Sequence, residues 1–342
     1  MIVTRVLRIL LAMLAAGSVP SVLRAEDSIP RTGSVEFRPG PREASLPKQF
    51  QLARHTFQFQ QTKLPTSSGR MRISSVAFPS PVTTPQPNNN TIHCEYFCPA
   101  QAGKKPAVVV LHILGGDFDL SRLFCRALAS NGVAGLFMIM PHYGPRKQPG
   151  SPARMISIDP EETVRGMTQA VLDVRQAAAW LADQDEIDAN QLGVMGISLG
   201  GITSALAVSL EPRFNKACLI LAGGDMGEVA WTSTEMAAVR EHWKKTGGSK
   251  ESLFAALKVI DPITYARPVA GRKILMLNAR RDEVVPQACT ESLWRAFGQP
   301  EIVWWDAGHY TAVRYIFEAM AKAVQFFQPT VQQPGESHTT AK

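Results

Sequence analysis

A single serine lies among glycines in the segment Gly196–Gly201, which reads Gly-Ile-Ser-Leu-Gly-Gly. Ser198 follows the apolar run Leu192–Met195 and precedes a run with helical spacing. A serine on a sharp strand-to-helix turn can attack a carbonyl carbon, and small residues two positions to either side let the two arms of the turn approach each other. The helix also brings its positive end close to the serine, where it favours a developing anion. The motif predicts a nucleophilic Ser198, and a tight turn without chemistry is the alternative.

A serine nucleophile needs a general base, and three histidines follow Ser198 in the chain. His242 lies in a polar insertion, and His338 lies in the polar C-terminal segment. His309 comes directly after the last apolar run and before the last helical one. Because a nucleophile on a strand-to-helix turn is typically followed by the acid and then by the histidine, we expect His309 to be the base.

The acid that orients the base is expected after the penultimate strand. Asp282 occupies this place and is the predicted acid. Glu283 is the local alternative, and Asp225, which follows an earlier strand, is the distant one. Asp282 would otherwise cap the next helix or pair with a neighbouring arginine.

Acyl transfer also needs two N–H donors for the oxyanion. Leu199, directly after the nucleophile, is the first predicted donor. The loop after Ala107–Ile113 is expected to supply the second, with Leu114 as the first choice and Ile113 as the alternative. His112 precedes the nucleophile and ends a strand, so we interpret it as a buried residue that shapes this loop.

Apolar runs of strand length alternate with segments of helical spacing along most of the chain. The expected strands are Arg72–Phe78, Thr91–Phe97, Ala107–Ile113, Val133–Met140, Gln191–Ile197, Ala217–Ala222, Lys273–Asn278 and Glu301–Trp305. The expected helices are 119–130, Glu161–Leu181, Leu199–Leu210, Pro286–Phe297 and Thr311–Phe327. Valine-rich runs without a polar face are typical of strands buried on both sides. The pattern predicts an α/β fold with a mostly parallel central sheet flanked by helices.

Two segments interrupt this alternation, Pro141–Asp159 and Gly223–Ile260. Both begin where a parallel strand ends, which is where open α/β sheets bind ligands. We expect them to form a substrate wall and a lid, with 224–260 as the lid. Trp231 and Trp243 either line an apolar or sugar-binding wall or anchor the lid.

Residues 106–328 resemble the α/β-hydrolase superfamily, and in particular its dienelactone-hydrolase-like and bacterial acetyl-xylan-esterase-like members. The resemblance is carried by Leu111–Gly116, Gly196–Gly201, Arg281–Pro286 and Gly308–Tyr310. It implies an α/β-hydrolase fold, a Ser-His-Asp triad, and neither a metal nor an organic cofactor.

The chain departs from these relatives at two positions. Dienelactone hydrolases have cysteine as the nucleophile where this chain has Ser198, which moves the expectation from lactone opening to ester cleavage. Relatives usually have glycine after the loop histidine where this chain has Ile113, which changes the expected shape of the oxyanion loop.

The N-terminal 25 residues are typical of a secretory signal peptide. Arg5 and Arg8 precede the apolar run Ile9–Ala16, and small residues follow. Cleavage is expected after Ala25, with a cut at 16–18 as the alternative. The run is too short to span a bilayer, so we expect no stable membrane span after cleavage and a secreted or periplasmic protein.

The rest of the chain divides into three predicted parts. Residues 26–68 are rich in proline, glutamine, arginine and serine, and we interpret them as a linker or arm that adds at most an edge strand near 57–60. Residues 69–328 form the predicted hydrolase domain, and 329–342 a disordered tail.

Charge and cysteine content exclude other classes of function. Of the net charge of +7, three units come from residues 1–25, which leaves a net charge of +4 and no basic stripe, so nucleic-acid binding is not expected. Cys94 and Cys98 lie four positions apart in an expected strand, too far for a disulfide, and with His93 they lack a second ligand pair for zinc. We expect five buried thiols and no metal site.

The predicted function is the hydrolysis of a carboxylic ester through an acyl-enzyme intermediate. Ser198 attacks, His309 takes its proton, Asp282 holds the imidazole, and the Leu199 and Leu114 N–H groups hold the oxyanion. The substrate is expected to be a small-molecule or carbohydrate ester. The alternatives are a serine peptidase of the same fold and a non-catalytic binding protein on a hydrolase scaffold.

Overall fold

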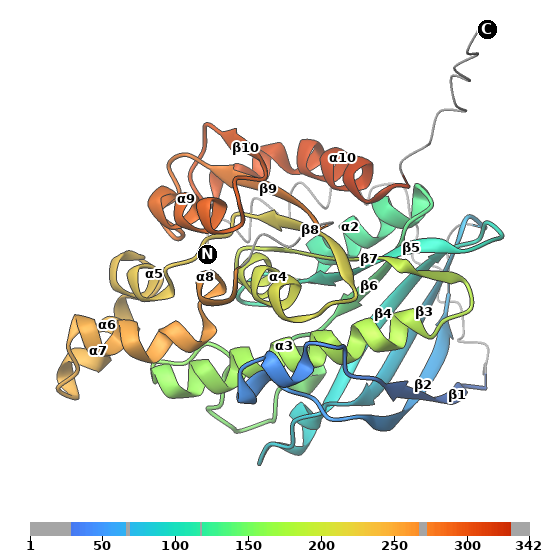
Figure 1. Ribbon diagram of the computed structural model, residues 1–342, viewed down its shortest axis with the longest axis horizontal. Helices are drawn as coiled ribbons and strands as arrows, with labels where there is room; N and C mark the ends of the chain where they lie inside the picture. Colours follow the sequence, from blue (N-terminus) through green and yellow to red (C-terminus); the bar gives the residue numbers. More distant parts are fainter. Residues whose placement is uncertain (1–28, 66–68, 117, 267–271, 330–342) are drawn as a thin grey trace, which may run out of the picture.

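The structure is a computed structural model that describes residues 29–65, 69–116, 118–266 and 272–329. In this part of the chain, ten strands form one sheet in the order β1-β2-β3-β4-β6-β5-β7-β8-β9-β10 (Figure 1). The strands are β1 (Arg31–Phe37), β2 (His55–Leu64), β3 (Met71–Pro79), β4 (Thr91–Pro99), β5 (Lys105–Leu111), β6 (Ala134–Met138), β7 (Ile187–Ile197), β8 (Phe214–Ile220), β9 (Lys273–Ala279) and β10 (Glu301–Trp305).

The sheet is antiparallel from β1 to β6 and parallel from β6 to β10. In β5 the side chains alternate between two apolar layers: Val109 and Leu111 face one, and Val108 and Val110 face the other. A strand covered on both faces gains by being apolar at every position. This confirms the predicted α/β fold with a mostly parallel sheet flanked by helices.

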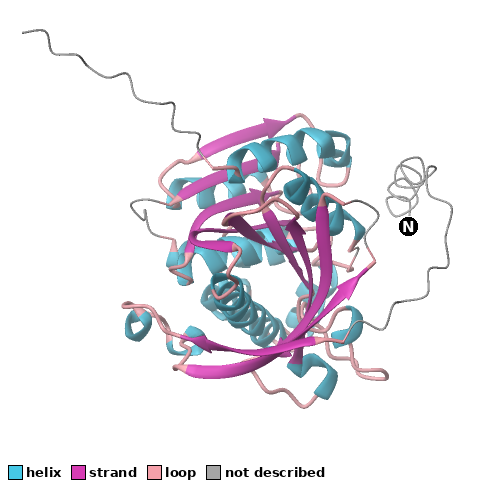
Figure 2. Ribbon diagram, turned by 90° about the vertical axis from the view of Figure 1, so that its right-hand side faces the viewer, coloured by secondary structure: helices cyan, strands magenta, loops and turns pink. Residues whose placement is uncertain are grey.

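Helices cover both faces of this twisted sheet (Figure 2). Helices α3 (Pro160–Ala182), α4 (Leu199–Leu210) and α9 (Gln287–Ala296) pack on one face, together with the shorter α8 (Pro262–Tyr265). Helices α2 (Asp119–Ser130) and α10 (Ile316–Phe327) pack on the other. The predicted final helix begins later than expected, because Thr311–Tyr315 forms a separate 3₁₀ helix.

Residues 29–65 are part of the folded domain, so the interpretation of 26–68 as a linker or loosely attached arm is wrong for these described residues. They supply β1 and β2, which extend the antiparallel half of the sheet. Phe57 and Phe59 alternate with exposed polar residues, and Phe59 packs edge-on against Trp180 of α3. The polar members of the alternation lower the average hydropathy of the strand, which is why composition alone suggested a linker.

A buried arginine joins this segment to the rest of the domain. Arg175 of α3 donates to Glu43, at 2.6 Å, and to Glu211, at 3.1 Å. The Arg175 and Glu211 side chains are fully buried. Because removing one partner of a buried ion pair is costly, the residues before β3 belong to the same folding unit as the helices.

The insertion after β8 is helical. It contains α5 (Met226–Thr232), α6 (Ala237–Lys245) and α7 (Lys250–Leu257), at the left of Figure 1. Helix α7 contacts both α5 and α3. Trp243 donates its Nε1–H to the Ser249 carbonyl within the insertion, which favours the anchoring role over a sugar-binding wall. Whether 224–260 opens and closes as a lid stays a prediction.

The predicted signal peptide, residues 1–25, lies outside the described residues, as does nearly all of the predicted tail, 329–342. Among the helices of the described residues, none combines the length and the apolar character needed to cross a membrane.

Candidate active site

Ser198 occupies the turn that joins the end of β7 to the start of α4. Its backbone has φ 54° and ψ −117°, a conformation that costs a residue with a side chain free energy and that is found at functional turns. The turn is held from both sides, because the Ser198 N–H donates to the Ile220 carbonyl of β8 and its carbonyl accepts from Ile202. This is the strand-turn-helix geometry that the sequence predicted.

Glycines around the turn are required by close backbone approach. A Cβ on Gly196 would lie 2.3 Å from the Gly200 carbonyl carbon. A Cβ on Gly200 would lie 2.6 Å from the Leu111 carbonyl oxygen and 2.7 Å from that of His112. All three distances are shorter than the contacts that real Cβ atoms make, so α4 can approach β7 and β5 only with glycine at these two positions.

The structure brings Ser198, His309 and Asp282 together, although they lie on three separate loops. His309 Nε2 lies 2.9 Å from Ser198 Oγ, and His309 Nδ1 lies 2.7 Å from Asp282 Oδ2. All three residues are less than one-tenth exposed. The hydroxyl can therefore pass its proton to an imidazole whose far nitrogen is fixed by a carboxylate.

The loops that carry the acid and the histidine are bound to each other. The N–H groups of Arg280 and Arg281 donate to the carbonyls of Trp305 and Ala307, each at 2.9 Å. These bonds continue the β9–β10 pairing beyond the strands. They hold the loop containing Asp282 against the loop containing His309.

Asp282 and the two alternative acids, Glu283 and Asp225, occupy different positions in the structure. The second oxygen of Asp282, Oδ1, accepts from the N–H groups of Val284 and Val285. Glu283 Oε2 accepts from the backbone N–H of His309 at 2.9 Å, so Glu283 fixes the main chain of the histidine rather than its ring. Asp225 precedes α5, in a left-handed conformation. The sequence predicts Glu283 only as a rival acid and carries no signal for this positioning contact.

The loop after β5 lies beside Ser198. Leu114 borders the same two cavities as Ser198, and the glycines that follow it, Gly115 and Gly116, have φ of 90° and 74°. Leu199 is the first residue of α4, so its N–H has no acceptor within the helix. The assignment of the Leu199 and Leu114 N–H groups as oxyanion donors stays a prediction.

His112 is fully buried beneath this loop, as its interpretation as a structural residue requires. Its Nε2 accepts from the Met140 N–H at 3.1 Å, so its Nδ1 carries the proton and donates to the Ile113 carbonyl at 2.8 Å. Burial lowers the pKa of His112 to about 4, and the histidine is neutral near pH 7. It ties the loop after β5 to the end of β6.

Two cavities of unequal size meet at Ser198. The larger, of about 530 Å³, is bordered by His309, Tyr310, the 3₁₀ helix after them and α10. The smaller, of about 80 Å³, lies on the other face of the sheet, bordered by α3, α4 and α5. Ile156, from the segment 141–159, borders the smaller one, and so do Val229 and Met236 from the 224–260 insertion. Residues from both insertions thus border the smaller cavity, and the roles of these segments as substrate wall and lid stay predictions.

A contact across the mouth of the site was not expected from the sequence. The Tyr310 hydroxyl donates to Glu235 in the loop between α5 and α6. Burial and the Glu235 carboxylate raise the pKa of Tyr310, so the tyrosine stays protonated and keeps donating. The insertion is thereby bound to the loop that carries His309.

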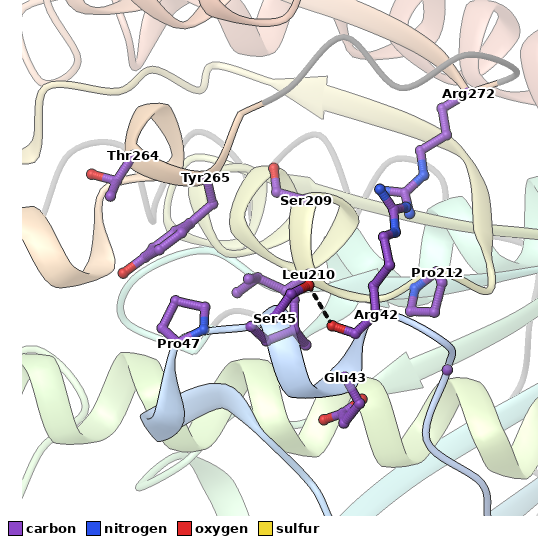
Figure 3. Close-up of a pocket in the computed structure, with 12 residues that line it drawn as sticks. Arg42, Glu43, Ser45, Pro47, Ser209, Leu210, Pro212, Thr264, Tyr265 and Arg272 are labelled. Carbon is purple, nitrogen blue, oxygen red and sulfur yellow. Dashed lines mark hydrogen bonds between the residues drawn. The ribbon is translucent and has the colours of Figure 1, made fainter.

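A further cavity, of about 150 Å³, lies at the opposite end of α4 from Ser198, roughly 18 Å away along the helix. Arg42 and Arg272 reach toward each other across it (Figure 3). The Arg272 guanidinium donates to the carbonyls of Val208 and Glu211 at the end of the helix, so it acts as a C-terminal cap. Its distance and its chemistry separate this cavity from the Ser198 site.

Within the described residues, no group of three or more histidine, cysteine, aspartate or glutamate side chains is placed to hold a metal ion. All five cysteines are buried and unpaired, as predicted. Cys94 and Cys98 both lie in β4.

The fold and the Ser198 site define an α/β hydrolase, and comparison with known families agrees. Residues 51–229, more than half of the chain, match the family described as alpha/beta hydrolase domain containing 18, and the chain belongs to this family. Residues 166–332 also match the prolyl oligopeptidase family.

A relative in Mycobacterium tuberculosis matches half of the chain. The chain is 31% identical over 175 residues to the uncharacterized protein Rv2627c of Mycobacterium tuberculosis, a match that covers 50% of this chain and 40% of that protein. The chain thus matches less than half the length of this relative.

Solved structures share the fold at low sequence identity. Acetyl xylan esterase 1 of Thermoanaerobacterium sp. superposes with a TM-score of 0.57 at 19% identity, covering 76% of this chain and 87% of that one. The acetyl xylan esterase of Paenibacillus sp. R4 superposes with a TM-score of 0.59 at 19% identity, covering 78% and 88%. These structures show that the chain has the α/β-hydrolase fold.

Proposed function

We propose that this protein hydrolyses carboxylic esters through an acyl-enzyme intermediate. The observation that carries the proposal is the hydrogen-bonded chain from Ser198 Oγ through His309 to Asp282, at 2.9 and 2.7 Å. It lies at the junction of two cavities, where a substrate carbonyl can reach the hydroxyl.

Each residue of the chain has a defined part in this mechanism. His309 Nε2 takes the Ser198 proton as Oγ bonds to the carbonyl carbon, and Asp282 stabilises the imidazolium that forms. The N–H groups of Leu199 and Leu114 are the proposed donors to the oxyanion. His309 then protonates the departing alkoxide, and afterwards takes a proton from the water that releases the acid.

Labelling with a fluorophosphonate probe tests the nucleophile. The wild-type protein should gain one adduct, detected by intact mass, and Ser198→Ala should gain none. His309→Ala should label at least about a hundredfold more slowly, because general-base assistance is worth that much. An adduct that persists in Ser198→Ala contradicts the proposal.

A serine peptidase is the second candidate, favoured by the match of residues 166–332 to the prolyl oligopeptidase family. The same three residues could cleave amides. Turnover of peptide amides, with none on alkyl esters, would select this candidate. Turnover of alkyl esters alone would select the esterase.

We also propose that the protein is exported, which rests on the basic, apolar and small-residue order of residues 1–25. Expression of the full chain in a bacterial host, followed by fractionation and intact mass, should give a periplasmic or secreted protein that begins at Glu26. A cytoplasmic protein of full mass contradicts this.

A further inference from the structure

The two cavities at Ser198 share part of their wall but differ in volume and in the other residues that border them. Leu114, Ser198, Glu235 and Val284 border both of them. A substrate carbonyl bonded to Ser198 Oγ must therefore direct one of its two substituents into each cavity. The sizes and neighbours of the cavities then decide which substituent goes where.

The larger cavity is suited to a bulky apolar group. Its volume of about 530 Å³ is more than three times that of a protein cavity of roughly 150 Å³ that holds benzene. Apolar side chains make up most of its wall, among them Leu120, Leu221, Trp305, Val313 and Ile316. A sugar would leave its hydroxyl groups without partners over most of this surface, which disfavours the carbohydrate esters expected from the sequence.

The smaller cavity is suited to a short group. Its volume of about 80 Å³ equals that of two or three water molecules, at roughly 30 Å³ each. Met167, Met226, Met236 and Leu257 are among the side chains that close it. Only a substituent of a few carbon atoms fits without displacing them.

His309 decides which cavity receives the alcohol. The departing alkoxide oxygen must lie next to His309 Nε2, because that atom protonates it. His309 borders the larger cavity and does not border the smaller one. Leu199, the proposed oxyanion donor, borders only the smaller one. The alcohol therefore extends into the larger cavity and the acyl group into the smaller one.

We propose that the substrates are short-chain acyl esters of bulky apolar alcohols. This inference rests on the proposed ester hydrolysis and adds its substrate class. The acyl carbon first bonds to Ser198 Oγ in a tetrahedral intermediate, while His309 takes the hydroxyl proton. The bond from this carbon to the alcohol oxygen then breaks, and His309 gives that proton to the departing oxygen. Water attacks the short acyl-enzyme with its proton taken by His309, and the bond to Oγ breaks as His309 returns a proton to Ser198, which releases the acid.

Two ester series measured with the full-length protein test the assignment. In the first, the acyl group is acetyl and the alcohol grows from ethyl to hexyl to 2-naphthylethyl, all with similar intrinsic reactivity. In the second, the alcohol is ethyl and the acyl group grows from acetate to butyrate to octanoate. We expect kcat/KM to rise by at least about tenfold along the first series and to fall by at least about tenfold along the second.

Two variants address one cavity each. Ile316→Trp adds volume to the wall of the larger cavity and should lower kcat/KM for 2-naphthylethyl acetate, relative to that for ethyl acetate, by about tenfold or more. Met236→Ala enlarges the smaller cavity and should raise kcat/KM for ethyl octanoate relative to ethyl acetate. Phe317→Trp adds a similar ring at the next position of α10, which borders neither cavity and is 53% exposed, and should change neither series.

The outcomes separate this inference from the proposed function. A preference for long acyl groups, or an Ile316→Trp effect confined to the acyl series, overturns the assignment of the cavities. Fluorophosphonate labelling of Ser198 with no preference along either series also overturns it and leaves the nucleophile in place. Absence of labelling would instead remove the proposed function itself.

Discussion

Asp282 divides its two carboxylate oxygens between two partners. Oδ2 is hydrogen-bonded to His309 Nδ1, and Oδ1 accepts hydrogen bonds from the N–H groups of Val284 and Val285. The backbone bonds prevent the carboxylate from turning away from the histidine. A residue at this position must therefore accept hydrogen bonds on both sides, which an amide cannot do.

Asp282→Asn should lower kcat by about 10⁴-fold while the protein stays folded. The amide oxygen can still accept from Val284 and Val285, so the NH₂ group faces His309 Nδ1. The imidazole then carries its proton on Nε2 and can no longer take one from Ser198. Steady-state kinetics on an alkyl acetate would measure the loss.

Glu283→Gln is the matched control for that substitution. The glutamine keeps an oxygen that accepts from the His309 backbone N–H, so kcat should fall by no more than about tenfold. An equal loss in both variants would show that Asp282 is not the orienting acid.

The buried His112 should make stability depend on pH. Its pKa is about 4 in the folded protein and about 6.5 in the unfolded chain. Between these values the unfolded chain binds more protons than the folded protein at this histidine. The contribution of His112 to the free energy of unfolding is therefore fully present above pH 6.5 and declines as the pH falls toward 4. The full shift corresponds to about 3 kcal/mol of unfolding free energy.

The contribution of His112 can be isolated by urea unfolding of the wild-type protein and of His112→Asn, each at pH 7 and at pH 4.5. Other titrating groups, including His93 and His142, whose pKa values burial also lowers, act in both proteins. The loss of unfolding free energy between the two pH values should be smaller in the variant by about 2 kcal/mol. An equal loss would assign the pH dependence to the other groups.

At the scale of elements, the turn between β7 and α4 was predictable because its requirements are local. Small residues, an apolar strand and a helical run are all visible in the sequence around Ser198. The 3₁₀ helix before α10 was not predicted. The Gly308 N–H donates to the hydroxyl of Thr311, the first residue of this 3₁₀ helix. Hydrophobic periodicity gives no signal for such a local polar contact.

Gly200→Ala should destabilise the protein by at least about 2 kcal/mol and abolish activity. The new Cβ would meet two carbonyl oxygens at the end of β5, so either α4 or the oxyanion loop must move. Thermal unfolding monitored by circular dichroism measures the loss. Gly69→Ala, where nothing lies within 4 Å of the new Cβ, is the control and should leave the midpoint unchanged or slightly higher.

Phe59→Ala in β2 should cost about 3 to 5 kcal/mol, because Phe59 is buried against Trp180 and its removal leaves a cavity. Gln58→Ala, on the exposed face of the same strand, should change stability by less than about 0.5 kcal/mol. Urea unfolding compares the two. Equal, small effects would support a loosely attached arm and contradict the packing of β2.

At the scale of the whole molecule, what was predictable from the sequence is the parallel half of the sheet, the adjoining strands β3 and β4, and the three loops that carry Ser198, Asp282 and His309. Their order follows from strand and helix alternation. The antiparallel edge at β1 and β2 was not predictable, because its stability comes from α3 through Phe59 and Arg175, which are distant in sequence. The unequal cavities were not predictable either, since each is bordered by elements far apart in the chain.

The five cysteines allow a final prediction about the whole molecule. All are buried, and burial raises the pKa of each thiol, so almost no reactive thiolate is present near neutral pH. A chromogenic disulfide reagent should titrate none of them in the native protein and all five in denaturant, even in protein recovered from an oxidising compartment. Dithiothreitol should leave the thermal midpoint unchanged. Fewer than five thiols in denaturant would reveal a disulfide and require a different packing around β4, where Cys94 and Cys98 lie.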